Sequence, residues 1–414
     1  MHGIENEAII TRFENTSILW NKVDYTNDDG QNPTKPFLGG TSVFQRRSAS
    51  FYNAQLGFGG TQNTTSISCE FGHFHVDAMR GQVIQTQPGG GQMEEISAII
   101  NGKPSGMRNW FKEQLPFKIK KYFKDFDVDN NYNGVGISMG WDSRYRRVFI
   151  TKKDYIPKTE LVYSNGSFYS GKTKVEFTNV DHFEDVSWTI AFSPILGTWI
   201  SFYDFKPNYY VNHNNYFQTG INSSDSKNGL WSHLLTNRSY NVFYGTKYPF
   251  EIELPVKTDL VNKKLESITL WTEAVRYENN HDFNINNTLT FDTSIIWNNV
   301  VCSGQLNLIP QKNNFINFSS YPKTNTNNTQ DILITNRDNF QWSYNYFYDR
   351  VKTTPYIVHD KNNIEKTVNS SAIAFKGINP LKRLQGDWFL NKLSYSKDSR
   401  FKLIFKFAIM NSEV

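Results

Sequence analysis

The sequence has little of several features that would place it in a familiar class. Its 414 residues include only two cysteines, Cys69 and Cys302. This excludes a disulfide framework and a four-cysteine zinc site, and it predicts two small buried side chains. No run of about 18 apolar residues occurs, so we expect no transmembrane helix. Residues 1–7 have neither a basic nor an apolar region, so we expect no signal peptide.

Charge and aliphatic residues are also sparse. The chain has 44 Lys+Arg against 39 Asp+Glu, a net charge of +5, which is too small over this length to indicate nucleic-acid binding alone. Hydrophobic residues make up 38% and the mean hydropathy is −0.56. Against this stand 32 Phe, 22 Tyr, 10 Trp and 46 Asn. This composition predicts a folded chain with a core of aromatic rings and turns of Asn and Gly.

Short strands joined by turns account for most of the chain. Residues 161–164 and 167–169 flank Asn165-Gly166, a pair that favours a type I′ hairpin because both residues tolerate positive φ. Alternating polar and apolar residues predict further hairpins of the same kind. These hairpins pair residues 135–141 with 147–151, 187–192 with 198–203, and 209–211 with 216–218.

Helical signals are confined to residues 105–126. Ser105 is expected to cap a helix that Pro116 ends, because proline cannot continue a helix. A second short turn is expected over residues 119–124.

A weak repeat of strand, polar turn and strand is anchored at Asp77, Asp142 and Ser193, with a spacing near that of four-stranded propeller blades. Strands of sandwich type follow from about residue 248. We therefore expect a mainly β protein in two parts. Residues 1–245 form a propeller-like antiparallel meander, with short helices near 105–125, and residues 246–414 form a β-sandwich-like domain.

Two patterns resemble catalytic or zinc sites. Gly136–Gly140 matches G-x-S-x-G, but a strand is expected after Ser138, whereas a nucleophile elbow needs a helix there. His73, His75 and Asp77 share one strand face, which suits a metal in principle. No second cluster completes such a site, so a polar strand face is the favoured interpretation.

The acidic segment after the helices resembles a calcium loop. Asp125, Asp127 and Asp129 have the alternation of calcium ligands, but Asn130 stands where glycine makes the bend and Gly136 where a bidentate Glu is needed. An exposed acidic turn is favoured, and a weak calcium site at the three aspartates is the alternative. No cofactor is expected.

No catalytic group emerges from the remaining patterns. The basic run at residues 118–124 is interpreted as a solvated face, with a DNA-lining or partner-binding surface as the alternative. No carboxylate pair stands out for glycoside hydrolysis. A large, aromatic-rich, β-rich chain without such groups indicates a structural or binding protein rather than an enzyme.

The order of several motifs resembles the C-terminal half of the tail nozzle ("muzzle", or stabilisation) proteins of crAss-like bacteriophages. The segments that carry the resemblance extend over most of the chain. They are residues 76–83, 109–111, 140–148, 188–193, 197–210, 244–245, 290–308 and 383–394.

The resemblance implies a virion protein, assembled in the host bacterial cytoplasm, at the distal end of a short tail. It implies a ring-forming homo-oligomer that closes or stabilises the DNA exit channel, contacts other tail proteins and transiently contacts exiting DNA, without membrane insertion. Family members carry more N-terminal β-structure. We therefore expect either a fragment or the product of a split reading frame, with an incomplete propeller over 1–245.

The alternative function is a receptor- or glycan-binding tail protein, with or without glycan-cleaving activity. Trp110, Trp141, Trp188 and Trp199 would then be platforms that stack on sugars. Their strand periodicity favours core packing instead.

Overall fold

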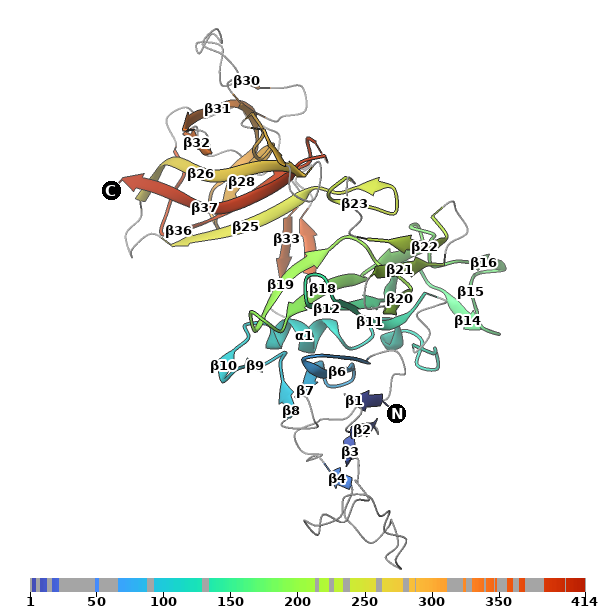
Figure 1. Cartoon of the computed structure of the whole chain (residues 1–414). Helices are drawn as coiled ribbons and strands as arrows, with labels where there is room; N and C mark the ends of the chain where they lie inside the picture. The colour runs from blue at the N-terminus through green and yellow to red at the C-terminus, as the bar shows by residue number, and fades with distance from the viewer. Residues whose placement is uncertain are drawn as a thin grey trace, which may run out of the picture. The chain divides into compact units, whose positions relative to one another are not determined.

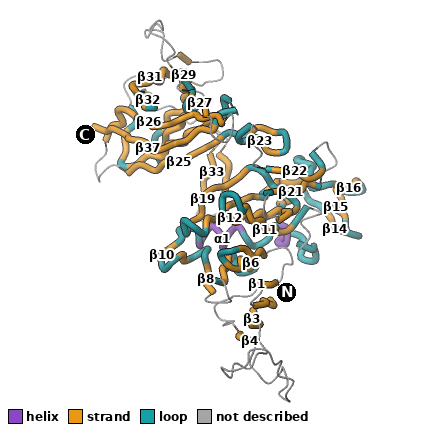
Figure 2. Tube along the Cα trace, in the orientation of Figure 1, coloured by secondary structure: helices purple, strands orange, loops and turns teal. Residues whose placement is uncertain are grey.

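The protein is mainly β in this computed structural model, as the sequence predicts (Figures 1 and 2). Two compact units divide between Leu234 and Leu235, whereas the sequence places the division near residue 246. The structure describes residues 2–4, 8–12, 17–21, 49–51, 66–87, 93–128, 134–212, 216–222, 227–233, 239–257, 263–277, 283–286, 288–310, 323–324, 330–338, 340–345, 347, 356–359, 365–368, 383–398 and 400–413.

The first unit is built from four antiparallel meanders in chain order. Three have four strands each, and the fourth has three among the described residues. Their strands are β1 (His2–Ile4), β2 (Ala8–Arg12), β3 (Ser17–Asn21) and β4 (Ala49–Phe51); β5 (Ser66–Cys69), β6 (Gly72–Asp77), β7 (Gln82–Thr86) and β8 (Met93–Glu95); β11 (Gly136–Asp142), β12 (Arg147–Lys153), β18 (Trp188–Ser193) and β19 (Thr198–Tyr203); β20 (Tyr209–Asn212), β21 (Phe217–Ile221) and β22 (Gly229–Ser232).

The first strand of each meander lies against the first strand of the next. β1 contacts β5, β5 contacts β11, and β11 contacts β20. Propeller blades also place their first strands side by side around an axis. A propeller is therefore compatible with this arrangement and stays a prediction.

The three anchors of the sequence repeat each hold a turn, but they do not mark successive blades. Asp77 Oδ1 accepts the backbone N–H of Arg80 at 3.1 Å, and Asp142 Oδ1 accepts that of Arg144 at 3.1 Å. Ser193 Oγ accepts a backbone N–H in the same way. However, Asp142 and Ser193 end β11 and β18, two strands of one sheet. The repeat therefore reflects a shared way of closing turns, not a blade period.

Short elements connect and cover the meanders. The predicted hairpin at Asn165-Gly166 is confirmed, with φ of +49° and +72° at the two residues. The remaining strands of this unit pair as β9 (Ile99–Ile100) with β10 (Lys103–Pro104), β13 (Tyr155–Pro157) with β17 (Phe183–Asp185), and β15 (Ser167–Ser170) with both β14 (Val162–Ser164) and β16 (Thr173–Val175).

The two described helices lie where the sequence predicts them. They are α1 (Arg108–Gln114) and the 3₁₀ helix η4 (Ile119–Lys121). α1 ends before Pro116, as expected, but Ser105 is not its N-cap: Met107 occupies that position. Ser105 Oγ instead accepts the Met107 backbone N–H at 3.1 Å and donates to a carbonyl of the preceding turn.

The core of the first unit is largely aromatic, as the composition predicts. Phe111 of α1 is fully buried, 4.6 Å from the Trp199 ring and 6.3 Å from the Trp188 ring. Phe168 contacts Phe177 and Phe183 in a second ring cluster. Each buried ring removes about 150–250 Å² from water, so few aliphatic residues are needed.

The second unit is dominated by one curled sheet of eleven strands, where the sequence suggested a sandwich-like domain. Its main path pairs β29 with β31 in parallel, an arrangement that hairpins alone do not produce. In order, the path is β25 (Phe250–Lys257), β36 (Trp388–Tyr395), β28 (Thr293–Trp297), β29 (Cys302–Pro310), β31 (Gln330–Asp338), β32 (Gln341–Tyr344), β26 (Lys263–Tyr277) and β27 (Phe283–Ile285).

Three further strands attach to this path: β30 (Lys323–Thr324) to β31, and both β35 (Gln385–Gly386) and β37 (Lys402–Glu413) to β26. Trp342, Phe389 and Leu393 are fully buried in the core of the sheet. Two hairpins also belong to this unit: β23 (Val242–Phe243) with β24 (Thr246–Lys247), and β33 (Tyr356–His359) with β34 (Glu365–Val368).

Candidate functional site

The calcium alternative receives no support from the acidic segment. Asp125 and Asp127 are both exposed, and Asp129 lies outside the described residues. Within the part of the chain that the structure describes, no group of three or more His, Cys, Asp or Glu side chains could hold a metal ion. A weak calcium site at the three aspartates stays a prediction.

His73, His75 and Asp77 form a buried polar face of β6. Both histidines are fully buried, with ring centroids 5.7 Å apart, and His73 Nδ1 lies 2.9 Å from Ser68 Oγ. Asp77 is paired with Arg80 at 3.3 Å in the following turn. Burial raises the pKa of Asp77, against the lowering effect of Arg80. This geometry agrees with the polar-strand interpretation.

Ser138 is not at a nucleophile elbow. It lies within β11, is 4% exposed, and is followed by four more strand residues and the hairpin to β12. An elbow serine would be exposed at a strand-to-helix turn. Of the two cysteines, Cys302 is buried and Cys69 is half-buried.

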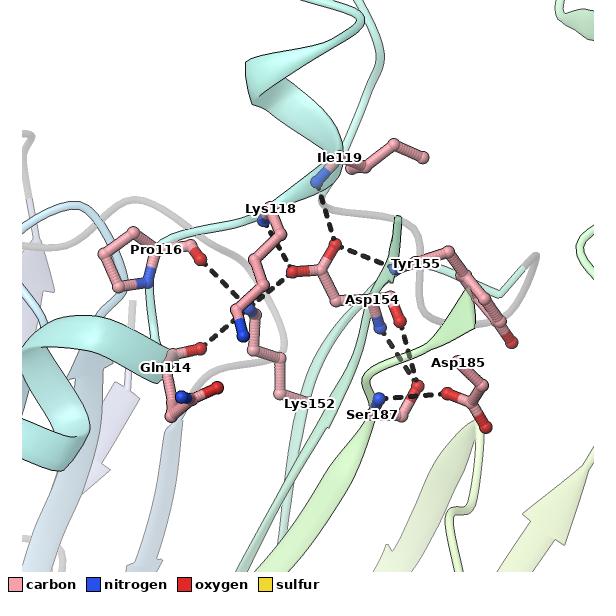
Figure 3. A network of polar contacts seen from close by, with 9 residues as sticks. All are labelled: Gln114, Pro116, Lys118, Ile119, Lys152, Asp154, Tyr155, Asp185 and Ser187. Carbon is pink, nitrogen blue, oxygen red and sulfur yellow. Dashed lines mark hydrogen bonds and ion pairs between the residues drawn. The ribbon is translucent and has the colours of Figure 1, made fainter. Parts of the chain in front are cut away.

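A strongly perturbed ionisable group is Lys152, near the end of β12 (Figure 3). Its Nζ donates to the carbonyl oxygens of Gln114 at 2.7 Å and Pro116 at 3.0 Å, and to Asp154 Oδ2 at 2.6 Å. It also lies 4.9 Å from the centre of the Phe117 ring. Burial lowers the pKa of Lys152 from 10.5 to about 8, although Asp154 opposes this shift.

Asp154 is equally enclosed and accepts hydrogen bonds from three backbone N–H groups. Its Oδ2 accepts from Lys118 at 2.6 Å, and its Oδ1 accepts from Ile119 at 3.2 Å and from Tyr155 at 3.0 Å. Ser187 Oγ accepts the backbone N–H of Asp154 at 3.1 Å (Figure 3). The carboxylate therefore satisfies donors at the start of η4.

This network is better suited to holding structure than to catalysis. Lys152 uses all three of its ammonium donors, and neither Lys152 nor Asp154 is more than 1% exposed. A general base or nucleophile must reach a substrate, whereas this pair joins β12 to the segment between α1 and η4. The sequence offers no signal for it, because most lysines and aspartates lie at the surface.

The lysines of the basic run at residues 118–124 are more exposed to solvent than Lys152. Lys120, Lys121 and Lys124 are exposed, and Lys118 is half-buried. This agrees with a solvated face.

Of the four tryptophans considered as sugar platforms, Trp188 is buried in the core of the first unit, and the other three are half-buried and pack against that core. Trp188 is 9% exposed, and its ring lies 4.9 Å from that of Trp110. Trp141 contacts Phe71 at 5.9 Å, and Trp199 Nε1 donates to a buried turn carbonyl at 3.2 Å. Core packing, the favoured sequence interpretation, is confirmed for Trp188, and the other three indoles are partly buried by contacts with the core.

An exposed apolar strand edge is a more open surface of the first unit. β19 is the last strand of its sheet, and among the described residues it pairs only with β18. Phe202 is 57% exposed and Leu196 of the preceding turn 71%. The register between β18 and β19 shifts between Ala191 and Phe192, so Ile200 falls between the paired residues Trp199 and Ser201. The sequence gives no sign of this edge, because strand periodicity does not reveal which strand ends a sheet.

No known family model matches the chain, and no curated protein matches it significantly.

Proposed function

We propose that the chain is a structural protein of a short bacteriophage tail, acting as one subunit of a ring that closes or stabilises the DNA exit channel. It belongs to the virion, assembles in the host cytoplasm, contacts neighbouring tail proteins and performs no catalysis. The support is the order of the sequence motifs, together with a β-rich fold whose core is packed with aromatic side chains.

Three of the motif segments contribute to one sheet, although the first is far in sequence from the other two. Residues 140–148 form the turn of the β11–β12 hairpin and the strand ends beside it, and residues 188–193 and 197–203 form most of the β18–β19 hairpin. β12 pairs with β18 over five residue pairs, from Val148↔Phe192 to Lys152↔Trp188. The motif residues therefore build one sheet, which favours a scaffold role for them.

The observation that carries the proposal is the exposed edge of β19. Edge strands with exposed apolar side chains are aggregation hazards unless another chain covers them. A second copy that covers β19 with a different part of its surface would make a head-to-tail contact, and such contacts form a ring when the rotation between copies closes. Phe202 and Ile200 would be at the centre of that contact.

The test is the mass of the full chain in solution, measured by light scattering over a concentration series. We expect a discrete ring-sized oligomer for the wild type. Phe202→Lys should shift it to smaller species, and Val162→Lys, at a 60% exposed position of the β14 hairpin, should not. Far-UV circular dichroism would establish that both variants are folded.

A wild-type monomer at every concentration would contradict the ring. An intact ring in both Phe202→Lys and Ile200→Lys would exclude β19 as the contact.

A further inference from the structure

The second unit has an exposed aromatic surface on β26 and β37, on the face of these strands that points away from the core of the unit. Trp271 and Phe407 are direct cross-strand partners, with ring centroids 4.2 Å apart and planes inclined by 17°. Leu270 and Thr272, which flank Trp271, are buried, so Trp271 is on the outward face. Phe407 remains 48% exposed and Ile409 46% exposed. Two stacked rings thus reach the surface of a sheet.

Polar side chains surround these rings in the same face. Gln341 of β32 is the cross-strand partner of Trp271 on the side away from Phe407, so an amide, an indole and a phenyl ring form one row. Lys406 forms an ion pair with Glu273 beside the row and lies 5.6 Å from the Phe340 ring.

The size of this apolar surface limits what it can bind. An aromatic side chain contributes about 150–250 Å² when fully buried, so two partly exposed rings and one isoleucine offer roughly 200–300 Å². A stable protein–protein interface buries about 800 Å² on each partner. The surface is too small to hold a protein subunit by itself, and its area suits one or two sugar rings.

The charge of the surface selects among small flat ligands. Nucleic acid requires uncompensated cations near stacking rings. Here the ammonium of Lys406 is paired with the carboxylate of Glu273, so it is not an uncompensated cation. A pyranose ring presents weakly positive C–H bonds on one face, which are attracted to the negative face of an aromatic ring. Its hydroxyl groups need nearby amide, carboxylate or ammonium partners.

We propose that this outward face binds a neutral saccharide, with one sugar ring stacked on Phe407 and its hydroxyl groups directed to Lys406 and Glu273. One face of the Phe407 ring is covered by Trp271, so its opposite face receives the sugar. Trp271 is a positioning residue that fixes the plane of Phe407. The inference goes beyond the proposed ring function and does not depend on it.

The test is affinity electrophoresis of the full chain in native gels that each contain one neutral polysaccharide: an α-glucan, a β-glucan, a mannan, a galactan or a soluble N-acetylglucosamine polymer. We expect retardation in at least one gel. Phe407→Ala should weaken binding by about tenfold or more, because a stacking contact of this kind is lost. Phe407→Tyr should retain binding.

Tyr122→Ala is the matched control, because Tyr122 is an exposed aromatic residue of the first unit, 55% exposed, and lies outside the proposed ring contact. It should migrate like the wild type. Absence of retardation in all five gels would overturn the proposal, as would equal retardation of Phe407→Ala and wild type.

Two further measurements separate other ligands. A lower mass of Phe407→Ala in light scattering, without saccharide binding by the wild type, would assign the face to a subunit contact. Retardation by single-stranded DNA alone would assign it to nucleic acid. Neither result depends on whether β19 forms a ring contact.

Discussion

The ring of Tyr210 lies directly over Gly140, and it allows no side chain there. A Cβ atom on Gly140 would be 2.3 Å from Cδ1 of Tyr210. The two residues belong to β20 and β11, the first strands of consecutive meanders. Tyr210 also hydrogen-bonds through its hydroxyl to Thr151 at 2.6 Å. The glycine therefore sets how closely two sheets of the first unit approach.

Gly140→Ala should destabilise the first unit by about 1–3 kcal/mol, because overpacking must displace a ring that is also held by a hydrogen bond. Chemical denaturation would measure the loss. In a double-mutant cycle, Tyr210→Ala should make the Gly140→Ala substitution nearly neutral. An equal cost of Gly140→Ala in both backgrounds would contradict the contact.

Asp154→Asn should destabilise the first unit by about 3–5 kcal/mol, because Lys152 would keep a buried charge without its counterion. The carboxamide would also lose acceptor capacity toward the N–H groups of Lys118 and Ile119. Denaturant titration checks this. Glu176→Gln is a control, since Glu176 forms an exposed ion pair with Lys174 at 3.5 Å, outside the network. A similar, small effect of both substitutions would refute the buried network as a source of stability.

The stability of the wild type relative to Lys152→Met should rise between pH 8 and pH 10.5. The folded state lowers the pKa of Lys152 from 10.5 to about 8, so within this range the unfolded chain binds the additional proton. Raising the pH removes this advantage of the unfolded chain. The free energy of unfolding should therefore rise by up to about 3 kcal/mol, at about 1.36 kcal/mol for each unit of pKa shift. Paired denaturant titrations at several pH values give the difference, and a flat difference would contradict the shift.

Acid should destabilise the first unit through His233. Burial, and secondarily Arg147, lower the pKa of His233 from 6.5 to about 4, so the unfolded chain binds a proton first as the pH falls. The stability from the neutral imidazole is complete above pH 6.5 and is lost progressively toward pH 4, up to about 3 kcal/mol. His233→Gln can still bond Thr219, which lies 2.7 Å from Nε2, and should remove this part of the pH dependence. Unchanged acid sensitivity in that variant would count against it.

Local sequence signals determined much of the secondary structure. Asn165-Gly166 closes the expected hairpin because both residues adopt positive φ, and Pro116 ends α1 because its ring excludes a further helical turn. Alternating side chains placed the hairpins of β11–β12 and β18–β19. These features depend on neighbours only a few residues away, which is why sequence alone predicts them.

Only the tertiary structure decided which distant strands meet. Trp271 and Phe407 stack because the C-terminal strand β37 pairs with β26, and Lys152 is buried because the segment after α1 covers the end of β12. Nothing in the local pattern distinguishes these residues from an ordinary strand aromatic or a surface lysine. Their environment is set by long-range pairing, in which burial and cross-strand contacts override local preference.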